Sequence, residues 1–156
     1  MTAGSHILNE LAERMASGTP HSEALGFRFI SVSPGRGSMA VAWREDLVGD
    51  PDTEVIAGGV VTSLLDHTCG LAISSAAASG AASGATSGAM FGTATLDLRI
   101  DYMRPARPRM GVTVEAHCYK LTQTVGFVRA EAWDEDRADP VATAQAAFVI
   151  NRPRPA

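Results

Sequence analysis

A single carboxylate, Asp66, lies in a segment of small and apolar residues that is typical of a helix. Residues 58–72 read GGVVTSLLDHTCGLA, and when they are wound at about 100° per residue the larger apolar side chains fall in one arc. This arc is expected to be buried against a sheet. The opposite arc permits a ligand or another backbone to approach Asp66, because its other residues are all small. These residues are Gly59, Thr62, Ser63, Cys69 and Gly70.

The two glycines that begin this helix, Gly58 and Gly59, form a second candidate. The first N–H groups of a helix lack acceptors within the helix and lie at its positive end, so they can bind the oxyanion that forms when a carbonyl group is attacked. Gly58 and Asp66 are eight positions apart, which is roughly 12 Å along a helix axis. One carbonyl cannot contact both groups of the same helix. A shared substrate therefore requires two chains, with antiparallel helices across a two-fold axis.

Both features also have plain structural interpretations, which the pattern alone leaves open. A lone helical Asp can be a surface residue or cap a neighbouring loop, and two glycines can form a turn into a helix. The thiols of Cys69 and Cys118 lack C-x-x-C spacing and are expected to be packed. No metal site is expected, because His6, His21 and His117 do not converge with other ligands at metal-binding spacing. The absence of a G-x-S-x-G motif argues against a serine hydrolase.

The segments before the helix predict elements that help to position it. Residues 5–16 carry one apolar stripe and are expected to form a short amphipathic helix, and the pattern breaks at Thr19-Pro20. Residues 27–32 and 38–43 predict two strands of a hairpin. Residues 45–54 are expected to form a polar, acidic loop.

The chain after the helix is expected to be β-structure. The helix is expected to end near residue 75, and the Gly-, Ser- and Ala-rich residues 74–90 predict a flexible connection that the alanines can shorten by extending the helix. Residues 93–102 alternate without interruption, which predicts that Thr95 lies on a polar side and Tyr102 on an apolar side. Three further strands are expected at 112–121, 125–133 and 141–150.

Strands joined by short loops form antiparallel sheets, and one helix must cover one face, so the fold class is α+β. The 156 residues fit one domain. We expect an N-terminal helix within residues 1–20 and a single domain at 21–151 with a flexible loop near 76–90. Residues 152–156 are expected to be a disordered tail.

Composition excludes several classes of function. The net charge of −4 and the sequence pI of about 5.5 provide no basic field for nucleic acid. No apolar run approaches the ~20 residues of a membrane span, and the N-terminal residues do not resemble a signal peptide. Two cysteines without a disulfide pattern favour a cytoplasmic location.

Three motifs in this order resemble the hotdog-fold thioesterases, in the branch of the phenylacetate-pathway and 4-hydroxybenzoyl-CoA thioesterases. The first is Ala57-Gly58-Gly59 followed by apolar positions and Leu64-Leu65-Asp66. The second is TATLDLRIDYMRPARPRM at 93–110, a strand that ends in an R-P-A turn, and the third is PVATAQAAFVI at 140–150. The resemblance covers about residues 20–150.

The resemblance implies a long helix wrapped by a curved antiparallel sheet, in homodimers with a continuous sheet that often pair into homotetramers. It implies an acyl-CoA thioesterase in which Asp66 acts as nucleophile or general base. The Gly58 N–H of the partner chain would polarise the thioester carbonyl, Gly59 would contact the substrate, and the Thr95 hydroxyl would assist the attacking water. No cofactor is expected, since coenzyme A is part of the substrate.

The sequence departs from the family at Ala57, where many members have His. His67 lies about 100° around the helix from Asp66, so it is expected to be a packing or interface residue. Arg104, Arg107 and Arg109 cluster after the R-P-A turn and are candidates for binding the phosphates of coenzyme A, although a solvated turn would look the same. Two alternatives to hydrolysis stay open, namely a non-catalytic acyl-CoA-binding protein and an acyl-thioester hydratase or dehydratase.

Overall fold

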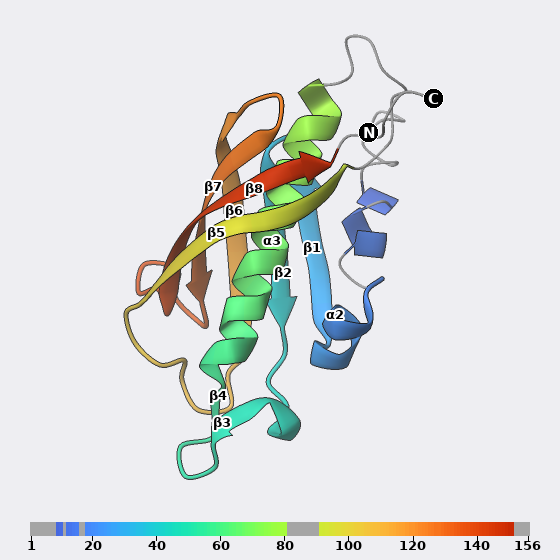
Figure 1. The fold of residues 1–156 in the computed structure, drawn as a ribbon. Coiled ribbons are helices and arrows are strands. Elements are labelled where there is room, and N and C mark those ends of the chain that lie inside the picture. The colour runs from blue at the N-terminus through green and yellow to red at the C-terminus, as the bar shows by residue number, and fades with distance from the viewer. Residues whose placement is uncertain (1–8, 11, 16–17, 81–90, 152–156) are drawn as a thin grey trace.

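One long helix, α3 (Gly58–Gly80), lies in the curve of a six-stranded antiparallel sheet in the computed structural model (Figure 1). The structure describes residues 9–10, 12–15, 18–80 and 91–151. The strands of this sheet follow the order β1-β2-β6-β7-β8-β5, which leaves β1 and β5 at its edges. They are Phe27–Ser33 (β1), Arg36–Val41 (β2), Gly92–Tyr102 (β5), Val112–Leu121 (β6), Val125–Trp133 (β7) and Ala142–Asn151 (β8). The expected α+β architecture is confirmed.

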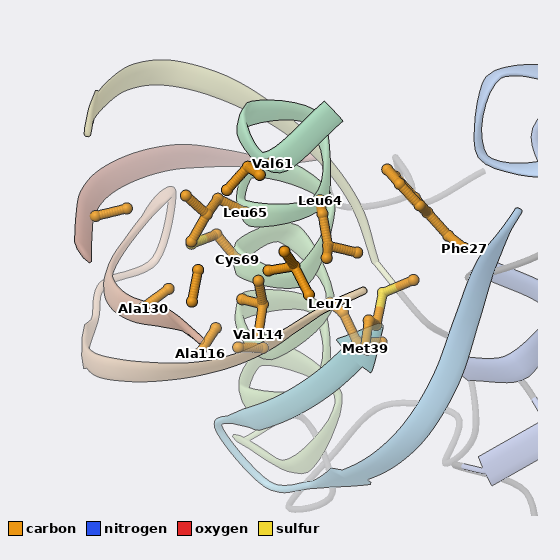
Figure 2. Close-up of a cluster of buried hydrophobic side chains, with 14 of the residues drawn as sticks. Phe27, Met39, Val61, Leu64, Leu65, Cys69, Leu71, Val114, Ala116 and Ala130 are labelled. Atoms are coloured by element: carbon orange, nitrogen blue, oxygen red, sulfur yellow. The ribbon is translucent and has the colours of Figure 1, made fainter. Parts of the chain in front are cut away.

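The core lies between α3 and the concave face of the sheet (Figure 2). Leu64 and Leu65 of α3 are fully buried, as are Val114 of β6 and Met39 of β2. The apolar arc that was expected to be buried is thus the arc that packs against the sheet. The helix is enclosed more completely than a single arc predicts, because residues 68–75 are all buried.

The helix continues to Gly80, five residues beyond the end expected near residue 75, because alanines at 76–78 extend it. The remainder of the expected flexible loop, residues 81–90, lies outside the described residues, as does the tail 152–156. In the N-terminal segment, residues 9–10 and 12–15 are helical, and Ala12 is fully buried.

Two regions of the chain contain elements that were not predicted. Thr19-Pro20 begins a second helix, α2 (Pro20–Leu25), because the Thr19 hydroxyl caps it and Pro20 occupies its first turn. The expected loop at 45–54 contains the 3-10 turn η1 (Glu45–Leu47) and the strand β3 (Val48–Asp50). The strand β3 pairs with β4 (Val55–Ile56), and this hairpin leads directly into α3.

The strand β5 contains a bulge. Thr95 pairs with Phe148 and Asp97 pairs with Ala147, so Leu96 is an extra residue without a partner across the ladder. The uninterrupted alternation expected over 93–102 is therefore wrong, because a bulge reverses which side chains face the helix. Leu96 is 60% exposed, and Leu98 and Ile100 pack against the core.

Candidate active site

Asp66 lies in the third turn of α3, just before the buried stretch 68–75, and it has one hydroxyl partner. The Thr95 hydroxyl donates a hydrogen bond to Oδ1 of Asp66 at 2.8 Å. Asp66 is half-buried, and its neighbours Thr62 and Ser63 one turn earlier are small and half-buried as well. One carboxylate oxygen is thus held by β5, and the half-buried side chains one turn earlier on the helix are small.

The other end of β5 contacts the start of the same helix. The Tyr102 hydroxyl donates a hydrogen bond to the carbonyl oxygen of Gly58 at 2.6 Å. The Thr62 hydroxyl lies 2.6 Å from the Tyr102 hydroxyl. Thr95 and Tyr102 are seven positions apart, so in a regular strand they would face opposite sides. The bulge at Leu96 brings both hydroxyls onto α3. Sequence reasoning did not select Tyr102 as a site residue, because uninterrupted alternation placed it on the side away from Thr95.

The first turn of α3 exposes both glycines. The N–H groups of Gly58 and Gly59 have no hydrogen-bond acceptor among the described residues, whereas the next two N–H groups bond to the Ala57 carbonyl. A side chain on Gly59 would meet no atom within 4 Å. The start of the helix therefore presents donors to open space, beside the hydroxyl of Tyr102.

The residue at the family's His position, Ala57, is tightly packed. A Cβ on Gly49 of β3 would lie 2.9 Å from the Cα of Ala57, so the hairpin backbone passes directly beside it. The Ala57 N–H donates to the Leu47 carbonyl at 2.8 Å. This packing fixes the chain just before the two glycines.

The nearby histidine and cysteine are structural. Nε2 of His67 lies 2.8 Å from the carbonyl oxygen of Met15, which can only accept, and its ring packs at 6.0 Å from the ring of Phe27. This agrees with the packing role expected for His67. Cys69 is fully buried, and burial followed by the nearby charge of Asp66 raises the pKa of its thiol. A thiol held protonated is a poor nucleophile.

Arg104, the first of the three predicted phosphate-binding arginines, is held by acidic groups of its own chain. It forms a two-pronged ion pair with Asp134 at 2.7 and 2.8 Å and also contacts Asp139 at 2.9 Å. The side chain of Asp134 is fully enclosed, and its hydrogen bonds with Arg104 lower the pKa of this carboxyl to about 2. Arg104 therefore ties the turn after β5 to the loop after β7.

Arg107 and Arg109 are more exposed but are also paired. The Arg107 side chain contacts Glu135, and its backbone N–H donates to Asp134 at 2.8 Å. Arg109 forms a two-pronged pair with Glu54 at 2.6 and 2.8 Å, which lowers the pKa of Glu54. The three arginines thus lie in one region, and each carries a carboxylate partner that a phosphate would have to share or displace.

A pocket of about 370 Å³ opens beside Gly58 and Tyr102. Most of its other lining residues are apolar, and Arg104 lies at its wall. They include Ile56, Val61, Met103, Pro105, Ala106 and Val141. The volume falls in the lower part of the range of small-molecule sites, which is about 300–1,000 Å³.

The described residues bring together part of the predicted site. Thr95 meets Asp66, whereas the glycine pair lies two turns away at the start of the same continuous helix. No group of three His, Cys, Asp or Glu side chains with metal-binding geometry occurs within the residues that the structure describes. In the same part of the chain, no helix has both the length and the apolar character of a membrane span.

The sequence profile of the thioesterase superfamily matches residues 54–141, more than half of the chain. The chain belongs to this superfamily. The match includes the helix start, Asp66 and Thr95. It confirms the resemblance of the chain to the hotdog-fold thioesterases, and it contains the first two of the three motifs, at residues 57–66 and 93–110.

The chain also resembles individual proteins, at low sequence identity. The chain is 25% identical over 134 residues to the medium/long-chain acyl-CoA thioesterase YigI of Salmonella typhimurium, covering 84% of this chain and 85% of the relative. A crystal structure of a Pseudomonas aeruginosa protein is 32% identical, with a TM-score of 0.73, covering 91% of this chain and 98% of the other. The PaaI protein from the phenylacetic acid degradation operon of E. coli shares the fold with a TM-score of 0.77 at 19% identity, covering 96% and 97% of the chains.

Proposed function

We propose that this protein hydrolyses acyl-CoA thioesters to the free acid and coenzyme A. The observation that carries the proposal is the Asp66–Thr95 pair, a carboxylate held by a hydroxyl at 2.8 Å on an open, small-residue face of the central helix. Membership of the thioesterase superfamily and the distant match to an acyl-CoA thioesterase support this chemistry.

The active site in this proposal is shared between two protomers. Gly58 and Asp66 lie on one straight helix and are separated by roughly 12 Å, so one thioester carbonyl cannot meet both within a chain. A second copy with an antiparallel α3 would place its glycine turn opposite Asp66. The edge strand β5 supports such an assembly, because it pairs only with β8 in the described chain and exposes Leu96 and Tyr102, and Met103 directly after it is exposed as well. A homodimer or homotetramer would cover this edge.

In the reaction we propose, the carbonyl oxygen of the thioester accepts hydrogen bonds from the glycine turn of one protomer. Asp66 of the other protomer either takes a proton from the attacking water or attacks the carbonyl carbon itself. The C–S bond then breaks, and the coenzyme A thiolate takes up a proton. In the covalent route this leaves a mixed anhydride of Asp66 and the acyl group, and water then attacks the Asp66 carbonyl carbon, which releases the acid and restores the carboxylate. The Thr95 hydroxyl orients Asp66 and leaves its second oxygen for this step. Single turnover in ¹⁸O-labelled water separates the two roles, since only the covalent route first delivers an unlabelled oxygen from Asp66 to the acid.

The pocket beside Gly58 is the proposed site for an apolar part of the substrate, since it adjoins the donors that would hold the carbonyl. Arg107 and Arg109 are exposed enough to exchange a carboxylate partner for a phosphate of coenzyme A, while Arg104 lines the pocket wall. No cofactor takes part in the proposed reaction.

One observation favours a second candidate, a non-catalytic acyl-CoA-binding protein. The position before the two glycines carries Ala57, where many members of the family have His, so an imidazole is lacking there. The same lack disfavours a hydratase or dehydratase, whose proton transfers usually need His beside an acid.

A panel of acyl-CoA esters, read by a thiol reagent, tests the proposal. We expect release of free coenzyme A from at least one ester by the wild type. Asp66→Asn should lose it while the protein keeps its oligomeric state and its affinity for a non-hydrolysable acyl-CoA thioether. Tight binding of esters without thiol release by the wild type would favour the binding protein, and hydration of an enoyl-CoA without thiol release would favour the hydratase. Full activity of Asp66→Asn would contradict the assigned carboxylate.

A further inference from the structure

The Tyr102 hydroxyl contacts the peptide group that joins Gly58 to Gly59. It donates to the Gly58 carbonyl oxygen at 2.6 Å, and this carbonyl belongs to the same planar unit as the Gly59 N–H. In a trans peptide the two groups point in opposite directions, and no described peptide is cis. Fixing the carbonyl therefore fixes the direction of the Gly59 N–H.

We infer that Tyr102 is a positioning residue that aims and polarises the Gly59 N–H as a donor to the oxyanion. This inference rests on the proposed thioesterase function and deepens it, since it adds a second donor beside the Gly58 N–H. A hydrogen bond to a carbonyl draws electron density toward oxygen and makes the N–H of the same peptide a stronger donor.

The surroundings of the glycine turn fit this role. The Gly59 N–H has no acceptor among the described residues, and the space around the Gly59 α-carbon is open to 4 Å. The Tyr102 ring lies against Gly58, where an added Cβ would meet it at 3.7–3.8 Å. Tyr102 and Gly58 also line the same pocket. The ring thus packs against Gly58, while the space around the Gly59 α-carbon stays open.

Thr62 completes a small network of hydroxyls. Each hydroxyl has a single proton, and the Gly58 carbonyl lies 2.6 Å from Tyr102 but 3.1 Å from Thr62. The shorter contact assigns the Tyr102 proton to the carbonyl, so Thr62 donates to the Tyr102 oxygen across 2.6 Å. Thr62 then strengthens Tyr102 as a donor, and it can take its place when the tyrosine hydroxyl is removed.

The bulge at Leu96 is what allows Thr95 and Tyr102 to face the same helix. It allows one strand to present Thr95 to the carboxylate and Tyr102 to the glycine turn. In the proposed dimer, the Thr95 contact belongs to one of the two shared sites, and the Tyr102 contact of the same chain belongs to the other. The strand β5 therefore positions both the acid and the oxyanion donors.

The test compares Tyr102→Phe and the double variant Tyr102→Phe/Thr62→Val with the wild type. The double variant matters because Thr62 can substitute for the lost hydroxyl. We expect kcat to fall severalfold in Tyr102→Phe and about tenfold or more in the double variant, below the loss caused by deleting a whole oxyanion donor. KM and the thermal midpoint should stay close to wild type. Tyr119→Phe is the matched control, since Tyr119 is an exposed tyrosine of β6.

A binding measurement separates positioning from a general structural effect. A trifluoromethyl ketone analogue of the acyl-CoA mimics the oxyanion, whereas a thioether analogue mimics the bound ground state. The double variant should lose affinity for the ketone by the same factor as kcat/KM and keep its affinity for the thioether. Unchanged kcat, or equal weakening of both analogues, would overturn the role of Tyr102 while leaving the thioesterase proposal intact. A wild type that releases no thiol and binds the ketone no better than the thioether would overturn both.

Discussion

Thr95 donates a hydrogen bond to one oxygen of Asp66, and in the proposed reaction the other oxygen acts on water or on the thioester carbonyl carbon. The orientation of Asp66 depends on the single hydroxyl of Thr95, so it can be tested without disturbing the core. The sequence pointed to Asp66 from its small neighbours, and to Thr95 only through the family resemblance. Their contact joins residues 29 positions apart, and no local pattern encodes such a distance.

Thr95→Val removes the hydroxyl and keeps the shape of the side chain. We expect kcat to fall about tenfold or more, because the carboxylate loses the bond that orients it for proton transfer. Thr95→Ser restores the hydroxyl and should recover most of the rate. Steady-state kinetics with the best ester of the panel measures both variants, and wild-type kcat in Thr95→Val would show that the contact is incidental.

Asp134→Asn tests the ion pair that ties the turn after β5 to the rest of the sheet. The pKa of Asp134 lies at about 2 in the folded protein, below its ordinary 3.8, so its carboxylate stabilises the fold above pH 3.8 and loses this effect as the pH falls toward 2. We expect the variant to be less stable by about 2 kcal/mol at neutral pH. The difference from wild type should shrink between pH 4 and pH 2.

Urea unfolding at several pH values measures this difference. Asp52→Asn is the control, because Asp52 is exposed and has no ion pair among the described residues. A stability gap that stays constant down to pH 2 would contradict the assigned pair.

At the scale of elements, the strand β5 sets the site through its bulge. Leu96 is 60% exposed and unpaired across the ladder, so its main contribution is the extra position that it occupies. Without that position, Thr95 and Tyr102 would lie on opposite faces of a regular strand.

Deletion of Leu96 should therefore separate the two contacts with α3. We expect the deletion variant to lose activity by about tenfold or more, because either Asp66 or the glycine turn loses its hydroxyl partner. Leu96→Met keeps both the residue count and an apolar side chain at the edge that the proposed dimer covers, so it should keep the activity. The comparison of kcat, with circular dichroism to verify the fold, distinguishes the two. Equal activity in both variants would show that the bulge has no part in the site.

The elements were predicted where periodicity was long and clear. The strands at 112–121 and 125–133 have the expected bounds, and the central helix buries the expected arc. The bulge was missed because polar and apolar residues alternate throughout 93–102. The sequence does not show which of these residues is left unpaired in the ladder. The hairpin of β3 and β4 was missed because two or three residues are too short for a period, and α2 because Thr19-Pro20 can either break a helix or begin one.

At the scale of the whole molecule, the proposed reaction requires a second chain, because the glycine turn and Asp66 of one chain cannot meet the same carbonyl. Both lie on the same continuous helix, and the open edge of β5 exposes apolar residues beside them. A homodimer that continues the sheet across β5 would bring Asp66 of one protomer to the glycine turn of the other. Static light scattering should accordingly report a dimer or tetramer.

The shared site is tested most directly by mixing two inactive variants. Asp66→Asn removes the acid, and Gly59→Val places a side chain over the donor side of the turn, where the structure leaves open space. Each variant alone should be inactive. When the two are unfolded together in equal amounts and refolded, about a quarter of the sites in a dimeric arrangement carry both intact halves. We therefore predict recovery of about a quarter of wild-type activity in the mixture. No recovery, from a mixture shown to contain hybrid oligomers, would contradict a site built from two chains.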